Sequence, residues 1–215
     1  FNPALVGRAF LSATFPNAMT NWSANQAGGG FFDLQPSLFA APLMQPQYDA
    51  LSAATPLGLM KFDQQPTALG DLMLGTSSGC IGETSGLLIL LGGIYLAARR
   101  MMDWRIPVGV LLAAALTALP FWLLDPIRYP DPLFVLLSGG LMLGAVFMAS
   151  DMVASPVTPL GVWIYGLFIG MLTVVIRLFG GLTEGVMYAI LLGNVIAPLI
   201  SGVTQPRIFG EGRKR

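Results

Sequence analysis

The stretch IPVGVLLAAALTALPFWLL, at residues 106–124, contains no charged residue and is almost entirely apolar. An α-helix needs about 20 such residues to cross the hydrocarbon core of a bilayer. Four further segments approach this length and are also apolar: residues 79–98, 133–149, 159–176 and 185–200. Five such segments in succession predict an all-α integral membrane protein, a multi-span bundle of about five transmembrane helices.

Small residues recur at close intervals within these segments. Gly139, Gly140 and Gly144 lie in one segment, and Gly166 and Gly170 lie in the next. Small residues allow helix backbones to approach one another closely in lipid. We therefore expect close helix packing in this bundle.

The composition supports a membrane protein. Of the 215 residues, 54% are hydrophobic and only 10% are charged, whereas a soluble domain has roughly 25% charged residues. The mean hydropathy is +0.70. Eleven basic residues balance eleven acidic ones, so no net charge attracts nucleic acid, and we expect membrane lipid rather than nucleic acid as the surrounding partner.

The chain has one cysteine, Cys80, and no histidine. This excludes iron–sulfur clusters and structural zinc sites held by this chain alone, disfavours haem, and makes a Ser-His-Asp triad impossible. We expect no metal site and no catalytic residue in the isolated chain. Redox chemistry here would require an organic cofactor.

The sequence divides into four parts. Residues 1–22 predict a short membrane half-helix or the end of a truncated span, with Asn2-Pro3 as its capped start and Arg8 facing a cavity, a partner or a ligand. Residues 23–78 are rich in Gly and Pro and predict an extended loop region too long to be an idle connection. A five-helix transmembrane domain over residues 79–202 and a basic tail over residues 203–215 follow. Phe1 does not begin a signal peptide, and we expect the chain to be the downstream part of a longer protein.

Several local motifs allow two interpretations. Thr55-Pro56 is typical of a helix start, with Thr as the N-cap. The Gly-Glu-Thr-Ser motif at residues 82–85 is either a capped helix start or a phosphate-binding helix terminus. Around Asp151, two Ser/Thr-Pro steps indicate irregular backbone that forms an ordinary polar loop or lines a cavity.

The basic residues indicate an orientation in the membrane. Arg99, Arg100 and Arg105 lie between the first two segments, and four more basic residues lie in the tail. The other loops hold only Arg128 and Arg177. Because Lys and Arg are enriched in cytoplasmic loops, the C-terminus is expected in the cytoplasm and Thr55 on the outer side.

These pieces together resemble the family that contains the D subunit of the Rnf (Rsx) electron-transport complex and the B subunit of the sodium-pumping NADH:quinone reductase. The matching stretches keep the family's order over nearly the whole chain: FNPALVGRAFL (1–11), SAATPL (52–57), GETS (82–85), WRIP (104–107), LSGGLMLG (137–144), SPVTP (155–159) and EGVMYAILL (184–192).

The resemblance implies ten spans in the complete protein and an FMN joined through its phosphate to Thr55. In this sequence Ala53 stands where the family usually has Gly. The resemblance also implies that Ser52, Pro56, Glu83 and Thr84 lie near this FMN. A second, non-covalent flavin, riboflavin, would lie near Asn2 and Arg8.

The resemblance further implies a subunit of a bacterial inner-membrane complex that relays electrons between ferredoxin and NAD and translocates ions. Its partners would be an outer-side flavoprotein subunit, a cytoplasmic NAD-binding subunit and, for maturation, a flavin transferase. The alternatives are the B subunit of the quinone reductase, which shares the flavin tether, a solute channel or permease without flavin, and a purely structural anchor subunit.

Overall fold

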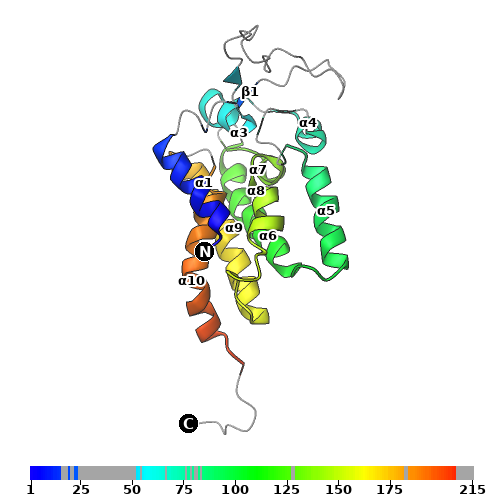
Figure 1. Cartoon of the computed structure of the whole chain (residues 1–215). Helices are drawn as coiled ribbons and strands as arrows, with labels where there is room; N and C mark the ends of the chain where they lie inside the picture. The colour runs from blue at the N-terminus through cyan, green and yellow to red at the C-terminus, as the bar shows by residue number, and fades with distance from the viewer. Residues whose placement is uncertain are drawn as a thin grey trace, which may run out of the picture.

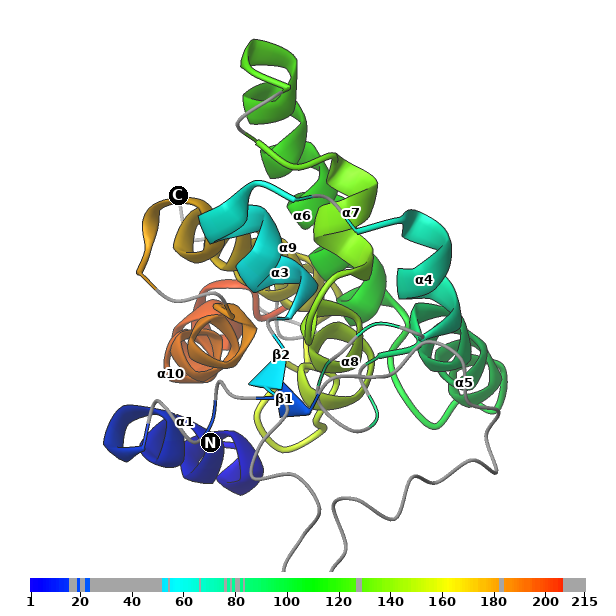
Figure 2. The same ribbon diagram turned by 90° about the horizontal axis from the view of Figure 1, so that it is seen from above.

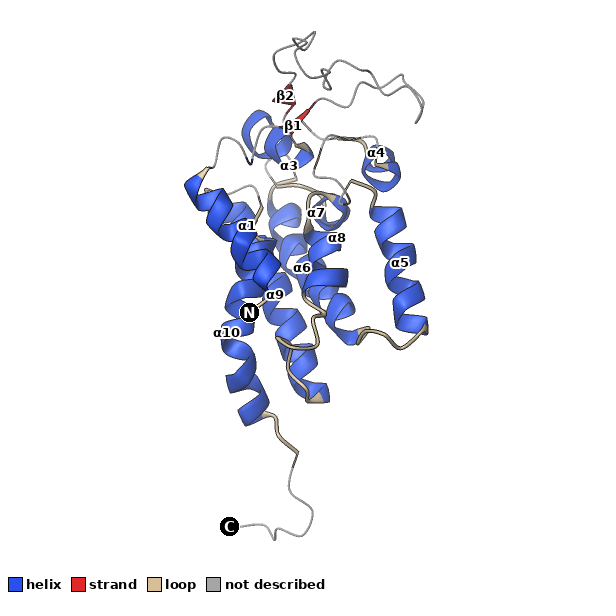
Figure 3. Cartoon of the chain, viewed as in Figure 1, coloured by secondary structure: helices blue, strands red, loops and turns tan. Residues whose placement is uncertain are grey.

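The computed structural model describes residues 1–15, 19, 22–23, 52–53, 55–65, 67–75, 77, 79, 82, 84–126, 129–181 and 184–206. In these ranges the chain is helical apart from a two-stranded ladder (Figures 1 and 3). The ladder pairs β1 (Trp22–Ser23) with β2 (Ser52–Ala53) in antiparallel fashion.

Three helices in the described part are long and apolar enough to cross a membrane: α6 (Arg105–Leu124), α9 (Pro159–Phe179) and α10 (Val186–Val203). A shorter apolar helix, α5 (Gly86–Ala98), precedes them. The prediction of an all-α membrane protein is confirmed. Apolar side chains cover both the buried and the exposed sides of these helices, as expected for helices in lipid.

The remaining elements are short. They are α1 (Pro3–Thr14), α3 (Pro56–Gly58), η2 (Leu59–Asp63), α4 (Leu69–Leu74), α7 (Pro132–Leu137), α8 (Leu141–Leu143) and η3 (Gly144–Met148), of which η2 and η3 are π-helical. As expected, the Asn2 side chain caps α1 by accepting from the backbone N–H of Ala4. The predicted loop region over residues 23–78 therefore includes the short helical elements α3, η2 and α4.

The segment at residues 133–149 differs from the continuous span that we expected. It is interrupted after Leu137, where Ser138 is extended and Gly139 adopts a left-handed conformation with φ +60°. A side chain at Gly139 would be strained by this φ and would collide with Leu57. The break thus depends on a glycine and on a neighbour from the Thr55 region.

The helices alternate in direction. Gly161, near the start of α9, lies against Ile200, near the end of α10. Figure 1 shows that the turn between α5 and α6 and the end of α10 lie at one end of the bundle, whereas α3 lies at the other. Thr55 and the basic residues of the first turn, Arg99 and Arg100, are thus at opposite ends. The basic tail at residues 207–215 lies outside the described residues.

The largest interface in the bundle joins α6 and α9, where glycines bring the two backbones together. A Cβ atom added at Gly166 would lie 3.0 Å from the carbonyl oxygen of Ile106, and one at Gly170 would lie 2.8 Å from the Cβ of Ala113. This is the small-residue packing expected from the sequence.

Helix α1 packs against α10, and an ion pair ties it to the start of that helix. Arg8 Nη2 lies 2.6 Å from Glu184 Oε2, and each side chain is 22% exposed. Leu5 is the side chain of α1 that is buried in the main core. The predicted half-helix is therefore held by the apolar contacts of Leu5 and Ala9 with the main core and by one ion pair.

We predict that Gly170→Val destabilises the bundle by about 1–3 kcal/mol, because the added carbons force α6 and α9 apart. The matched control is Gly202→Ala, since a Cβ at Gly202 meets nothing within 4 Å. The control is expected to be neutral or slightly stabilising. Thermal unfolding in detergent measures both, and equal melting temperatures for the two variants would contradict the packing argument.

We also predict that Arg8→Glu lowers stability by about 1–2 kcal/mol, because it leaves two like charges in a half-buried contact. The double exchange, Arg8→Glu with Glu184→Arg, is expected to recover part of this loss. Thermal unfolding of the single and double variants measures the coupling. A double variant no more stable than Arg8→Glu alone would show that the ion pair is not what joins α1 to α10.

Candidate functional site

Thr55 lies at the start of the short helix α3, on the end of the bundle farthest from the basic turn (Figure 1). Its Oγ1 accepts a hydrogen bond from the backbone N–H of Gly58, at 3.2 Å, and Pro56 occupies the first helical position. The N-cap predicted from Thr55-Pro56 is confirmed. Because Oγ1 acts as an acceptor here, this contact does not consume the hydroxyl hydrogen.

A narrow cleft adjoins Thr55. It is lined by Thr55, Pro56, Leu72, Ser77, Gly79, Thr84, Leu137 and Gly139, and its volume is only about 10 Å³. This is room for about one water molecule.

The segment at residues 55–63, here called the Thr55 segment, is fixed to the bundle by an apolar contact. Leu57 is buried and packs with Leu72 and Phe134 in a small core separate from the main one. Leu57 also covers Gly139 at the break between α7 and α8. The view from above shows α3 lying beside the ends of α7 and α9 (Figure 2).

A lysine holds the other end of the Thr55 segment. Lys61 Nζ donates hydrogen bonds to the carbonyl oxygens of Arg177, at 2.9 Å, and Gly180, at 2.5 Å. These carbonyls belong to the end of α9, where a cation is favourable. Partial burial of the ammonium group lowers the pKa of Lys61 below its ordinary value.

Beneath the Thr55 segment lies a buried arginine. Arg177, which is 6% exposed, donates from Nη1 to the carbonyl oxygen of Val135, at 2.8 Å, and from Nη2 to that of Ser138, at 3.2 Å. We expected Arg177 in an outer loop, and this was wrong, because α9 continues to Phe179. The guanidinium satisfies carbonyls at the end of α7 that no further helical turn can reach.

The other predicted site residues fall in different places. Thr84 joins Thr55 and Pro56 at the cleft, whereas Asn2 and Arg8 lie on α1, where Arg8 pairs with Glu184. Glu83 lies outside the described residues, and Ser52 is described only as part of β2. The described structure thus brings together three of the predicted residues, Thr55 and its neighbours Pro56 and Thr84, at the cleft.

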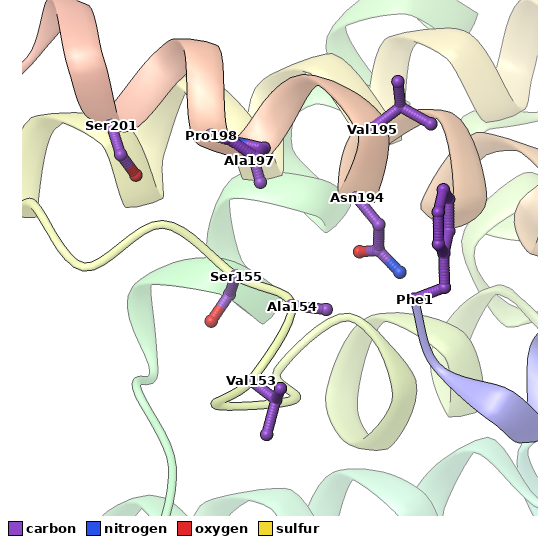
Figure 4. A pocket seen from close by; sticks show the side chains of 9 residues that line it. All are labelled: Phe1, Val153, Ala154, Ser155, Asn194, Val195, Ala197, Pro198 and Ser201. Atoms are coloured by element: carbon purple, nitrogen blue, oxygen red, sulfur yellow. The ribbon is translucent and has the colours of Figure 1, made fainter.

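A second and larger pocket, of about 470 Å³ and open to the surface, lies against α10 (Figure 4). Its lining residues are Phe1, Val153, Ala154, Ser155, Asn194, Val195, Ala197, Pro198 and Ser201. The irregular turn that follows Asp151 contributes three of them. Both interpretations of this turn stay open, because Val153 lines the pocket but is 92% exposed, as in an ordinary surface loop.

The sequence analysis placed one buried polar residue, Arg177, in a loop and did not single out another, Asn194. Both lie inside apolar helices and are at most 9% exposed. A polar or charged residue within a membrane span is itself a signal of function or of a structural network. That signal identifies the residues, but their partners come from segments far away in the sequence.

Comparison with known proteins identifies the family. Residues 1–210 match the family model described as the NQR2, RnfD, RnfE family. A relative from Alcanivorax borkumensis, named as the D subunit of an ion-translocating oxidoreductase complex, is 43% identical over 98% of this chain.

Two further relatives are 41% identical to this chain. One, from Clostridium ljungdahlii, is named as the D subunit of a proton-translocating ferredoxin:NAD(+) oxidoreductase complex, and the match covers 99% of this chain. The other, from Acetobacterium woodii, is named as the Na(+)-translocating counterpart, and the match covers 97%. The matches span 63%, 62% and 58% of the three relatives, so this chain corresponds to about three fifths of their length. With the apolar helices, the Thr55 motif and this similarity along its whole length, the chain belongs to the NQR2, RnfD, RnfE family.

Proposed function

We propose that this chain is part of a membrane subunit of an Rnf-type complex and relays electrons through FMN attached by a phosphoester to Thr55. In the complete complex the electrons would pass between ferredoxin and NAD, coupled to ion translocation. FMN would supply the electron-carrying chemistry, which no side chain of this chain offers. The chain's own contribution is to hold the attachment point in place.

The observation that carries this proposal is the placement of Thr55. It stands half-buried at a surface cleft, in the family's motif, on a segment fixed by Leu57 and Lys61 to the ends of two helices. An attachment point for a cofactor benefits from such a rigid base, because electron transfer requires a fixed distance between donor and acceptor. An ordinary helix cap requires no such base.

The fit of the residues supports the proposal. Thr55 Oγ1 accepts a hydrogen bond from Gly58, and an ester oxygen retains acceptor lone pairs. The cap therefore remains possible after attachment. The small cleft beside it, with Thr84 on its wall, leaves the ring to lie above the bundle, within reach of a partner subunit.

The orientation of the chain in the membrane is part of the proposal. The end of the bundle that carries Thr55 would face the outer side of a bacterial inner membrane, and the end with Arg99 and Arg100 would face the cytoplasm. The partners would be an outer-side flavoprotein subunit and a cytoplasmic NAD-binding subunit, with a flavin transferase needed for attachment.

A non-covalent second flavin, riboflavin, near Asn2 and Arg8 completes the proposed relay. Phe1, next to Asn2, lines the larger cavity, whose volume of about 470 Å³ is in the range of small-molecule sites. Arg8 is held by Glu184, so its contribution would be to position α1 beside this cavity.

The B subunit of a sodium-pumping NADH:quinone reductase is the nearest alternative, because it belongs to the same family and shares the tether. The names of the relatives described above, all of them D subunits, favour the Rnf-type complex. A permease without flavin and a structural anchor are the remaining alternatives.

We predict that Thr55→Ala abolishes covalent flavin in this protein. The chain offers a matched control, because Thr158 forms the same cap before Pro159 and accepts from the backbone N–H of Gly161 at 3.1 Å. Each alanine variant is expected to cost about 1 kcal/mol of helix capping. In-gel flavin fluorescence after full denaturation, with the flavin transferase co-expressed, is the measurement.

The expected result is a fluorescent band in the wild type and in Thr158→Ala, and none in Thr55→Ala. A band that persists in Thr55→Ala would place the flavin on another residue. The absence of a band in all three proteins, with the transferase active on a known substrate, would leave Thr55 as a helix cap and favour the permease or anchor alternative.

We predict that Lys61→Met leaves the flavin attached but makes it more mobile, because the Thr55 segment loses its hydrogen bonds to the end of α9. The fluorescence anisotropy of the attached flavin is expected to fall, while the in-gel band keeps its intensity. Lys214→Met, in the tail, is the control. Unchanged anisotropy in Lys61→Met would show that Lys61 does not hold the attachment point.

A further inference from the structure

We propose that the turn between α5 and α6 binds the headgroup of an anionic phospholipid. This turn, at residues 99–105, is here called the basic turn. Arg99, Arg100 and Arg105 bind the phosphate group of the lipid, and an acyl chain lies along the exposed apolar face of α5. Three features support this site: guanidinium groups without partners, an unfavourable backbone position that carries one of them, and the aromatic and apolar surface beside them.

The basic turn has an excess of positive charge. It contains three arginines and one aspartate, Asp103. The Asp103 carboxylate accepts a hydrogen bond from the backbone N–H of Arg105, at 3.1 Å, at the start of α6. Within the ranges that the structure describes, the guanidinium groups of Arg99, Arg100 and Arg105 form no ion pair and no hydrogen bond. They are therefore available to an anion from outside this chain.

Arg100 occupies a backbone position that favours glycine. The backbone N–H of Arg100 donates to the carbonyl oxygen of Ala97, and that of Met101 donates to the carbonyl oxygen of Leu96, each at 3.0 Å. This pair of hydrogen bonds ends a helix with one residue in the left-handed conformation, usually glycine. Arg100 is that residue, with φ +55°. Because a side chain is disfavoured at this φ, the arginine at this position indicates a use for its side chain.

Two tryptophans lie beside the basic turn. Trp104, which precedes Arg105, is 52% exposed, and its ring centroid lies 6.1 Å from that of Trp163 on α9, with the rings edge to face. Tryptophan is enriched at membrane–water interfaces, where its ring lies at the level of the lipid headgroups. Figure 1 shows the turn between α5 and α6 at one end of the bundle. This pair therefore supports a position of the basic turn at headgroup level.

An apolar face of α5 leads to the basic turn. Leu87, Leu91, Ile94 and Tyr95 have the spacing of one helix face, and all four side chains are exposed in the described structure. Arg99 follows one helical turn after Tyr95. Figure 2 shows α5 at the edge of the bundle. This face provides a path for an acyl chain that begins beside the arginines.

These features together favour a phospholipid over other anionic partners. A guanidinium group binds phosphate oxygens through parallel N–H donors, a chemistry that a phospholipid shares with a free phosphate ion. Free phosphate makes no use of the apolar face of α5, and an acidic protein segment matches only the charge. An anionic phospholipid matches the charge, the indole ring and the apolar face together. Clusters of basic residues next to membrane helices attract such headgroups.

The test uses the complete protein in its assembled complex, in detergent and depleted of lipid. The probe is a phosphatidylglycerol with a diazirine near the start of one acyl chain, and a phosphatidylcholine with the same diazirine is the neutral reference. After irradiation, peptide mapping by mass spectrometry measures the labelling of residues 86–98 as a function of the mole fraction of the probe. Labelling on the other membrane helices is the internal standard.

We expect phosphatidylglycerol to label residues 86–98 of the wild type at a lower mole fraction than phosphatidylcholine. In Arg99→Gln the mole fraction of phosphatidylglycerol at half-maximal labelling is expected to rise about five-fold, which corresponds to about 1 kcal/mol for one arginine near an anionic lipid. The matched control is Arg213→Gln, which removes one basic residue from the tail and leaves the basic turn intact. No change is expected in the control.

Arg100→Gly separates lipid binding from the stability of the turn. Glycine adopts a φ of +55° without strain, so the melting temperature of this variant is expected to stay the same or rise. The mole fraction at half-maximal labelling is nevertheless expected to rise about five-fold, as in Arg99→Gln. Arg100→Lys retains the positive charge and is expected to remain close to the wild type.

Four results would overturn the inference. Equal labelling of the wild type by the two lipids would show lipid contact without a choice of headgroup. Unchanged labelling in both Arg99→Gln and Arg100→Gly would show that the arginines do not bind the phosphate group. Competition by inorganic phosphate but not by unlabelled phosphatidylglycerol would assign the turn to a free anion. Labelling confined to other helices of the wild-type complex would show that a neighbouring subunit covers this surface.

The lipid site does not depend on a flavin at Thr55. The basic turn and Thr55 lie at opposite ends of the bundle (Figure 1), so the in-gel flavin band is expected in every variant of the basic turn. Absence of that band from the wild type would contradict the proposed function alone. The labelling of residues 86–98 would still decide on the lipid site.

Discussion

The contact between the Arg177 guanidinium and the carbonyl oxygens of Val135 and Ser138 is the constraint on which this structure depends. A helix that stops inside a membrane bundle leaves carbonyl groups without partners, and lipid offers none. Arg177 supplies the donors from another helix, so α7 can end and the chain can turn at Gly139. Without such donors, a continuous helix over residues 133–149 would be the more stable form.

The break in turn creates the surface on which the Thr55 segment rests. Leu57 packs over Gly139, where no side chain intervenes, and Lys61 reaches the carbonyls at the end of α9. Arg177 takes part in both features. Its side chain binds the carbonyl groups at the end of α7, and its backbone carbonyl oxygen accepts a hydrogen bond from Lys61. One residue therefore links the interior of the bundle to the segment that carries the proposed attachment point.

The same helix connects the two ends of the molecule. Arg177 lies at the end of α9 near Thr55, whereas Tyr165 lies earlier on α9 and holds Asn194 beside the larger cavity. Between these two residues, Gly166 and Gly170 bring α9 into backbone contact with α6. Such close packing limits the movement of α9 against α6.

The sequence alone determined the fold class, the second, fourth and fifth apolar helices, and the caps at Asn2 and Thr55, because apolar length and local capping depend on neighbouring residues only. It also indicated the family, through short motifs that keep the family's order along the chain. It did not indicate the break at Ser138, the buried position of Arg177 or the direction of the Asn194 amide. Each of these depends on a partner far away in the chain: Leu57 for Gly139, Val135 for Arg177 and Tyr165 for Asn194. Tertiary structure decided them, because a buried polar group must find its hydrogen-bond partner wherever the packed helices place one.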